Sequence, residues 1–148
     1  MQKLRRERDM VKEENYGALL TEIAKVLQRK YTHMSEISRL TEEMAEGLSR
    51  DDRVSVQMTL CMRGEEIEKI RECDRDFHLF LNSVPLEVKE WLMKVVDGKI
   101  SSSEKYGKEG MLVVRLAGSI HNVWEKTMMV DRHMNKRLAG ADSFYADR

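Results

Sequence analysis

Proline and aromatic residues are scarce in this sequence. The chain of 148 residues has a single proline, and only 6% of its residues are aromatic. Eight glycines and a charged fraction of 35% complete a composition that is typical of helices and unlike that of a β-sandwich or β-barrel. A chain of this length can bury a core of its own. We therefore expect an all-α protein.

No sign of charge dominates the chain, and it contains no long apolar run. Lys plus Arg and Asp plus Glu both number 26, so there is no overall field that would attract nucleic acid or an anionic membrane. No segment has the apolar length of a membrane span or the pattern of a secretory signal. We expect a cytoplasmic protein whose partners are other proteins, with no nucleic-acid binding and no membrane insertion.

Residues that carry catalysis or hold metals are few and badly spaced. Cys61 and Cys73 would lie about 18 Å apart along one helix, too far for a disulfide, so we expect reduced thiols. The four histidines form no i, i+4 pair and no zinc-binding spacing with cysteine. No phosphate-binding loop is present either. The sequence predicts no enzyme, no cofactor and no metal.

The segment VVDGKISSSE, residues 95–104, looks like the second half of a calcium-binding EF-hand loop. If Glu104 were the bidentate ligand at loop position 12, the first and third ligand positions would be Met93 and Val95, which have no side-chain oxygen. The segment is better explained by Gly98 ending one helix and a serine capping the next.

Apolar residues recur at helical spacing along most of the chain. They predict a helical hairpin over residues 16–48 and 52–82, a short helix over 85–97, and a C-terminal helix over 103–140. Residues 1–15 would be an N-terminal arm, and residues 141–148, with Phe144 and Tyr145, a tail. The predicted architecture is a single domain, an elongated antiparallel helical bundle of three long helices plus one short helix.

The apolar rows of each helix predict the core. The first helix places Leu20, Leu27 and Met34 in one row, Tyr16, Ile23, Ile37 and Met44 in the next, and Leu19, Val26 and Leu40 in a third. The second helix has Val56, Ile70 and Phe77 in one row and Leu60, Ile67 and Leu81 in the other. Arg63 and Asp74 interrupt that grid; either they form ion pairs between helices or they are exposed. Val88, Trp91, Leu92 and Val95 are the apolar face of the short helix.

Two stretches resemble a known family. MAEGLSRDDRVSVQMTLCMRGEEIEKIRECD, residues 44–74, resembles the hairpin of bacterial flagellar export chaperones of the FlgN type, in which a polar turn precedes a basic residue and a regular apolar spacing, here Arg63, Ile67 and Ile70. VDRHMNKRLAG, residues 130–140, resembles the last helix of that family, with Asn135 three residues before Leu138.

The resemblance implies a non-enzymatic cytosolic chaperone. It would bind flagellar hook-associated subunits before export and deliver them to the type III export apparatus. An amphipathic helix of the cargo would pack against the last helix of this chain. The expected contact residues are Val123, Met128, Val130, Met134, Asn135 and Leu138. The alternative is a self-associating helical scaffold or adaptor, in which a homodimer buries the same apolar stripe.

Overall fold

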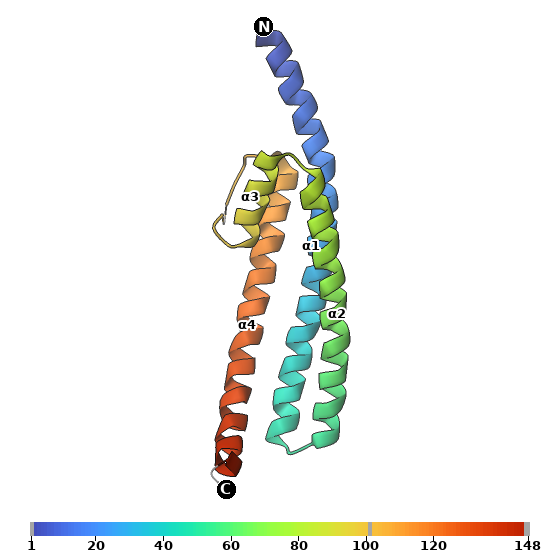
Figure 1. The fold of residues 1–148 in the computed structure, drawn as a ribbon. Helices are drawn as coiled ribbons and strands as arrows, with labels where there is room; N and C mark the ends of the chain where they lie inside the picture. Colours follow the sequence, from blue (N-terminus) through green and yellow to red (C-terminus); the bar gives the residue numbers. More distant parts are fainter. Residues whose placement is uncertain (1, 101, 147–148) are drawn as a thin grey trace. The chain divides into compact units, whose positions relative to one another are not determined.

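A computed structural model gives the fold of the chain. It describes residues 2–100 and 102–146, and the side chains of residues 16–100 and 102–137. These residues form four helices and no strand: α1 (Gln2–Ser49), α2 (Arg53–Ser83), α3 (Leu86–Val96) and α4 (Gly107–Ala146) (Figure 1). The expectation of an all-α protein is therefore confirmed.

The turn between α1 and α2 is closed by two consecutive aspartates. Asp51 has a positive φ of 55°, a conformation that Asp tolerates better than most residues. Asp52 caps α2, because its carboxylate accepts hydrogen bonds from the backbone N–H of Ser55 at 3.1 Å and from the Ser55 hydroxyl at 2.7 Å. The same two hydrogen bonds hold the pKa of the Asp52 carboxyl below its usual value.

Glycines set the connection from α3 to α4. Gly98 has a φ of 77°, and hydrogen bonds from Gly98 N to Val95 O and from Lys99 N to Lys94 O close the end of α3, as predicted. Gly107 also has a positive φ, of 70°, and α4 begins there rather than near Ser103. The Ser103 hydroxyl accepts a hydrogen bond from Lys105 N inside the connection. At its other end α4 continues to Ala146, past Gly140.

The chain divides into two compact units, and α1, α2 and α4 each contribute to both. Unit 1 comprises residues 1–31 and 71–121, and unit 2 comprises residues 32–70 and 122–148. The short helix α3 belongs to unit 1.

The interior of unit 1 is apolar. Its buried side chains are Leu20, Ile23, Ala24, Val26, Leu27, Cys73, Phe77, Leu81, Val84, Val88, Trp91, Leu92, Val95, Val113, Val114, Leu116 and Ala117. The predicted face of the short helix lies in this core, together with Leu20, Ile23, Val26 and Leu27 from the predicted rows of the first helix. Burying side chains of this size removes a large apolar area from water, which is the main stabilising contribution to a fold.

An aromatic cluster closes the end of unit 1 that contains α3. The ring of Tyr106 lies 4.7 Å from that of Trp91 and 5.9 Å from that of Tyr16, both with edge-on geometry. Gly110 makes room for the cluster, because a Cβ at that position would lie 2.8 Å from the Cβ of Tyr106. A side chain at position 110 would therefore push the cluster apart.

The interior of unit 2 is partly polar. Met34, Ile37, Leu40, Met44 and Met134 are buried, but so are Ser38, Thr41, Thr59 and Thr127. Each threonine hydroxyl donates to the carbonyl four residues earlier in its own helix, at 2.7–2.8 Å. These bonds satisfy the hydroxyl groups without contributing apolar packing between helices.

The core prediction was wrong for part of α2. Leu60 and Ile67 are exposed, and Val56 and Ile70 are only half-buried, although Phe77 and Leu81 of the same rows are buried. The polar residues Thr59, Arg63 and Glu66 occupy the inward face of α2 in unit 2, so its apolar residues turn to the flanks and the outside.

Candidate protein-binding surface

We first consider the described side chains that could hold a metal or act as nucleophiles. No group of three His, Cys, Asp or Glu side chains among them could hold a metal ion. Cys73 is 2% exposed, and burial raises the pKa of its thiol, which disfavours the nucleophilic thiolate. Cys61 is a free, exposed cysteine.

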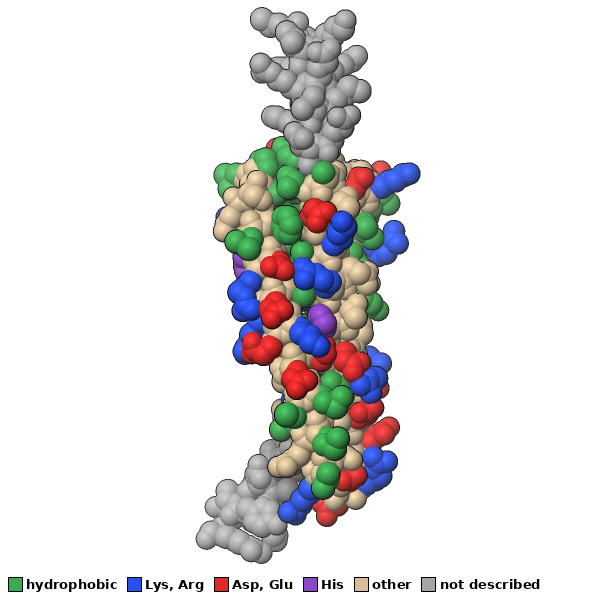
Figure 2. All heavy atoms as spheres, turned by 90° about the vertical axis from the view of Figure 1, so that its right-hand side faces the viewer, with side chains coloured by type: hydrophobic (Ala, Val, Ile, Leu, Met, Phe, Trp, Pro, Cys, Tyr) green, Lys and Arg blue, Asp and Glu red, His purple; other side chains and the backbone are tan. Residues whose placement is uncertain are grey.

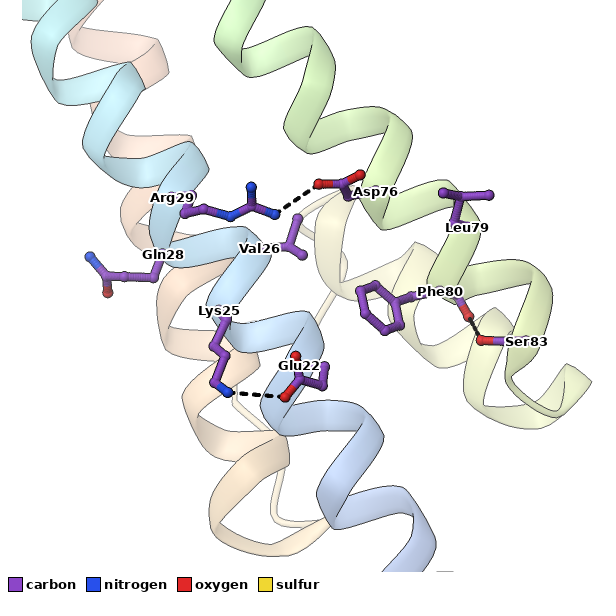
Figure 3. A pocket seen from close by; sticks show the side chains of 9 residues that line it. All are labelled: Glu22, Lys25, Val26, Gln28, Arg29, Asp76, Leu79, Phe80 and Ser83. Atoms are coloured by element: carbon purple, nitrogen blue, oxygen red, sulfur yellow. Dashed lines mark hydrogen bonds and ion pairs between the residues drawn. The ribbon is translucent and has the colours of Figure 1, made fainter.

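Unit 1 has an open groove of about 840 Å³ between α1 and α2. Glu22, Lys25, Val26, Gln28, Arg29, Asp76, Leu79, Phe80 and Ser83 line it (Figure 3). Arg29 donates to Asp76 at 2.9 Å across the groove, and Lys25 pairs with Glu22 at 3.0 Å. Because these charges already pair with one another, the groove presents no charged group prepared for a ligand.

The residues predicted to contact a partner differ in their degree of burial. Met134 is buried, and Val123, Met128 and Val130 are half-buried. Asn135 is exposed. The side chain of Leu138, like those of Phe144 and Tyr145 in the predicted tail, lies outside the described residues. Met134 is therefore a core residue of unit 2 and does not present a surface for another protein.

An ion pair marks the line where α2 meets α4 in unit 2. Arg63 Nη1 donates to Asp131 Oδ1 at 2.8 Å and to the Thr41 hydroxyl at 3.3 Å. The side chains of Arg63 and Asp131 are only 20% and 26% exposed, so the pair is largely shielded from water. Of the two alternatives for Arg63, the structure shows the ion pair. Asp74 also pairs, with Lys30 at 2.7 Å in unit 1.

Two rows of side chains, one on α2 and one on α4, include this ion pair and continue on both sides of it. We call the two rows together the α2–α4 seam. On α2, residues 56, 60, 63, 67 and 70 recur at alternating steps of four and three, so Val56, Leu60, Ile67 and Ile70 share the helix face of Arg63. On α4, residues 124, 128, 131 and 135 follow the same rule, so Trp124, Met128 and Asn135 share the face of Asp131. Both faces are apolar apart from the ion pair and Asn135.

The seam leaves much of its apolar surface in contact with water. Leu60 is 51% exposed and Trp124 is 46% exposed; Ile67 is also exposed, and Met128 is half-buried. Of the predicted contact residues, Met128 and Asn135 lie in these rows. Leu60 and Ile67 were predicted as core residues, because the apolar spacing of α2 does not distinguish an inward row from a flanking one, and Trp124 was not among the predicted contact residues. The polar residues Thr59 and Glu66 were the signal in the sequence, because their positions show that the inward side of α2 in unit 2 is polar.

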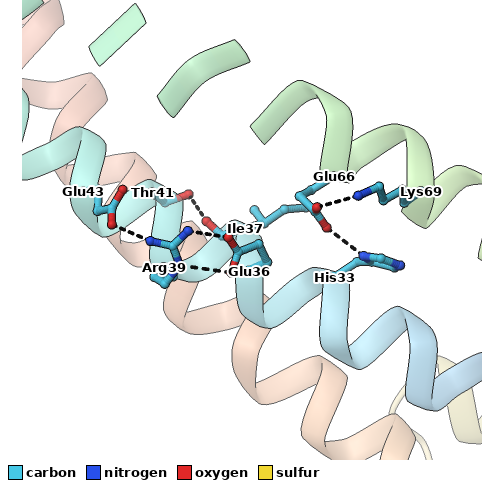
Figure 4. Close-up of polar contacts among 8 residues, drawn as sticks. All are labelled: His33, Glu36, Ile37, Arg39, Thr41, Glu43, Glu66 and Lys69. Atoms are coloured by element: carbon cyan, nitrogen blue, oxygen red, sulfur yellow. Dashed lines mark hydrogen bonds and ion pairs between the residues drawn. The ribbon is translucent and has the colours of Figure 1, made fainter. Parts of the chain in front are cut away.

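In unit 2, one polar contact between α1 and α2 lies among further ion pairs that stay within each helix (Figure 4). His33 Nδ1 lies 2.7 Å from Glu66 Oε2, and Lys69 Nζ donates to the other oxygen at 3.0 Å. Burial opposes ionisation of Glu66, but Lys69 and His33 together hold its pKa below the usual value. Further along α1, Arg39 pairs with Glu36 and Glu43 on the same helix.

Within the part of the chain that the structure describes, no helix is both long enough and apolar enough to cross a bilayer. No protein-family model, no curated protein and no solved structure matches the chain.

Proposed function

We propose that the chain is a cytoplasmic, non-enzymatic chaperone of the flagellar type III export system that binds hook-associated subunits. Its working form would be an elongated antiparallel bundle of three long helices and one short one, which delivers its cargo to the export apparatus. The resemblance of residues 44–74 and 130–140 to export chaperones of the FlgN type supports this assignment.

The exposed apolar rows of the α2–α4 seam carry the proposal. Leu60 and Ile67 on α2, with Trp124 and Met128 on α4, offer an amphipathic helix a strip of apolar surface. A bound helix would shield these side chains and the Arg63–Asp131 pair from water. Methionine suits such a surface because its flexible thioether adapts to different apolar partners. Asn135 would contact the edge of the bound helix.

Binding of synthetic terminal helices of hook-associated subunits tests the proposal directly. In a calorimetric titration, the double variant Ile67→Lys with Trp124→Ser should lose at least about tenfold in affinity, because it removes two apolar contacts from the strip. Leu79→Lys is the matched control, since Leu79 is an exposed apolar residue of α2 in unit 1. Loss of binding in the control alone would assign the site to the groove of unit 1.

A chain that binds none of these helices would overturn the chaperone assignment. The same surface would then suit the alternative function, a helical scaffold or adaptor. Helicity of each variant, measured by circular dichroism, separates lost binding from lost folding.

A further inference from the structure

The Arg63–Asp131 pair has hydrogen-bonding capacity that the described residues do not use. A guanidinium carries five N–H donors. Within the described part of the chain, Arg63 donates only through Nη1, to Thr41 at 3.3 Å and to Asp131 at 2.8 Å, so the N–H groups of Nε and Nη2 have no acceptor there. The second carboxylate oxygen of Asp131 likewise accepts no hydrogen bond from these residues. The two side chains are 20% and 26% exposed, so water reaches the pair.

The pair lies deeper than the apolar residues beside it. Leu60 precedes Arg63 by three positions on α2 and is 51% exposed, and Ile67 follows Arg63 by four positions and is 37% exposed. On α4, Trp124 lies seven positions before Asp131 on the same face and is 46% exposed. A helix that packs on these more exposed side chains therefore covers the pair and removes it from water.

Covering the pair is unfavourable unless the partner replaces its contacts with water. A buried donor or acceptor without a partner costs more free energy than an ordinary hydrogen bond contributes. A helix with only apolar side chains at this point would leave N–H groups of Arg63 and one oxygen of Asp131 in that condition. The centre of the seam therefore disfavours a purely apolar partner, although most residues of the two rows are apolar.

Long-range charge gives little selectivity to this surface. The chain has 26 basic and 26 acidic residues, and side chains of both signs intermingle on the face of the molecule in Figure 2. This balance provides no overall field that would select an acidic or a basic partner. Selectivity therefore depends on short-range contacts such as those at the Arg63–Asp131 pair.

A carboxamide matches the pair better than a charged group does. Glutamine and asparagine carry a carbonyl acceptor and two N–H donors, so one side chain can accept from Arg63 and donate to Asp131. The pair as a whole is neutral. A carboxylate on the partner would be repelled by Asp131 and an ammonium group by Arg63, and either group would be buried without a counter-charge of its own.

We propose that the seam binds an amphipathic helix of another protein that places a glutamine or asparagine over the Arg63–Asp131 pair. Apolar residues three and four positions before and after that amide contact the two apolar rows. This inference rests on the proposed function, because it takes the seam as the binding surface and adds what the bound helix carries at its centre.

Four helical peptides that differ at one position test the proposal. Each has about 18 residues, enough to form a helix, with leucine three, four and seven positions before and after the central residue. The central residue is glutamine, glutamate, lysine or leucine. In calorimetric titrations of the full chain, the glutamine peptide should bind most tightly, about tenfold more tightly than the leucine peptide and several-fold more tightly than the two charged ones.

The double variant Arg63→Met with Asp131→Leu is the matched control. It replaces both charges with apolar groups, so the order should reverse and the leucine peptide should bind most tightly. Leu79→Lys, which changes an exposed residue of unit 1, should leave the order of the four peptides as in the wild type. Circular dichroism checks that each variant keeps its helicity.

A second variant tests the pair without changing its size. Asp131→Asn removes the negative charge that repels a carboxylate and leaves the positive charge of Arg63 in place. The glutamate peptide should then gain at least several-fold in affinity and bind more tightly than the glutamine peptide. An unchanged order of peptides in this variant would show that the central residue does not contact the pair.

The outcomes separate this proposal from the proposed function. Equal affinities of the four peptides for the wild type, or a preference for glutamine that persists in the double variant, would overturn the amide contact and leave the chaperone assignment in place. The amide contact is also wrong if none of the four peptides binds while terminal helices of hook-associated subunits do. If neither set of helices binds, both proposals fail.

Discussion

Unit 1 and unit 2 draw on the same three long helices but differ in what they bury. In unit 1 every buried side chain among the described residues is apolar, and α3 adds four of them: Val88, Trp91, Leu92 and Val95. All four buried polar residues that the structure describes, Ser38, Thr41, Thr59 and Thr127, lie in unit 2.

The difference between the two units depends on which residues of α2 face inward. In unit 1 this helix turns Cys73, Phe77 and Leu81 inward, whereas in unit 2 it turns Thr59, Arg63 and Glu66 inward. Apolar residues that are not needed inside unit 2 are found on its outer surfaces. We infer that unit 1 supplies most of the stability, whereas unit 2 buries less apolar surface and leaves more of it exposed.

The largest effect should come from the core of unit 1. Leu92→Ala removes a side chain with no exposed surface and should lower the free energy of unfolding by about 3 kcal/mol. Leu86→Ala is the matched control, because Leu86 lies in the same helix but is 70% exposed. Urea denaturation of both variants measures the difference. Equal losses would show that α3 is not part of the stabilising core.

The Arg63–Asp131 pair should have the next largest effect. Arg63→Ala leaves the carboxylate of Asp131 largely shielded from water without its partner, and we expect a loss of about 2 kcal/mol. In the double variant Arg63→Met with Asp131→Leu, much of this loss should be recovered, because apolar groups replace both charges. Thermal unfolding of the single and double variants gives the coupling free energy between Arg63 and Asp131. Additive losses would mean that the pair does not connect α2 to α4.

Glycine substitutions should have smaller effects of opposite sign. Gly98→Ala should cost about 1 kcal/mol, because the φ of 77° is strained for any residue with a Cβ. Gly118→Ala should instead stabilise by roughly 0.5–1 kcal/mol, since this helical glycine has open space around the position of a Cβ. Melting temperatures of the two variants should move in opposite directions. A lower melting temperature in both variants would show that a Cβ at position 118 meets neighbouring atoms.

The smallest effect should be a pH dependence that arises in unit 2. Because the folded pKa of Glu66 is lowered, its contribution to stability is complete above the pKa of the unfolded chain and is lost as the pH falls through the folded value. Glu66→Gln should therefore reduce the acid sensitivity of the free energy of unfolding by less than about 1 kcal/mol. An unchanged acid profile from pH 6 to pH 3 would contradict the assignment.

Sequence reasoning succeeded where local patterns determine structure. The all-α fold, the inward rows of α1, the apolar face of α3 and the end of α3 at Gly98 follow from helical spacing and from the conformational freedom of glycine. The start of α4 was harder to locate, because Gly107 adopts a left-handed conformation only in the context of the connection that precedes it.

The candidate surface was predicted less completely. The residues predicted on α4 form one apolar stripe in the sequence, but the structure divides that stripe into the buried Met134, the half-buried Val123 and Val130, and the seam residue Met128. Which side of a helix becomes the inside depends on its neighbours. Arg63 and Asp131 are distant in the sequence, and their pairing makes a polar side of α2 face inward.

Hydrogen exchange read by mass spectrometry tests the division of roles between the two units most directly. At a concentration where the chain is monomeric, backbone amides at residues 20–27 and 113–117 in unit 1 should exchange only through global unfolding. Amides at residues 54–62 in unit 2 should exchange through local openings of lower free energy. Equal protection of the two regions, or stronger protection of residues 54–62, would contradict the account.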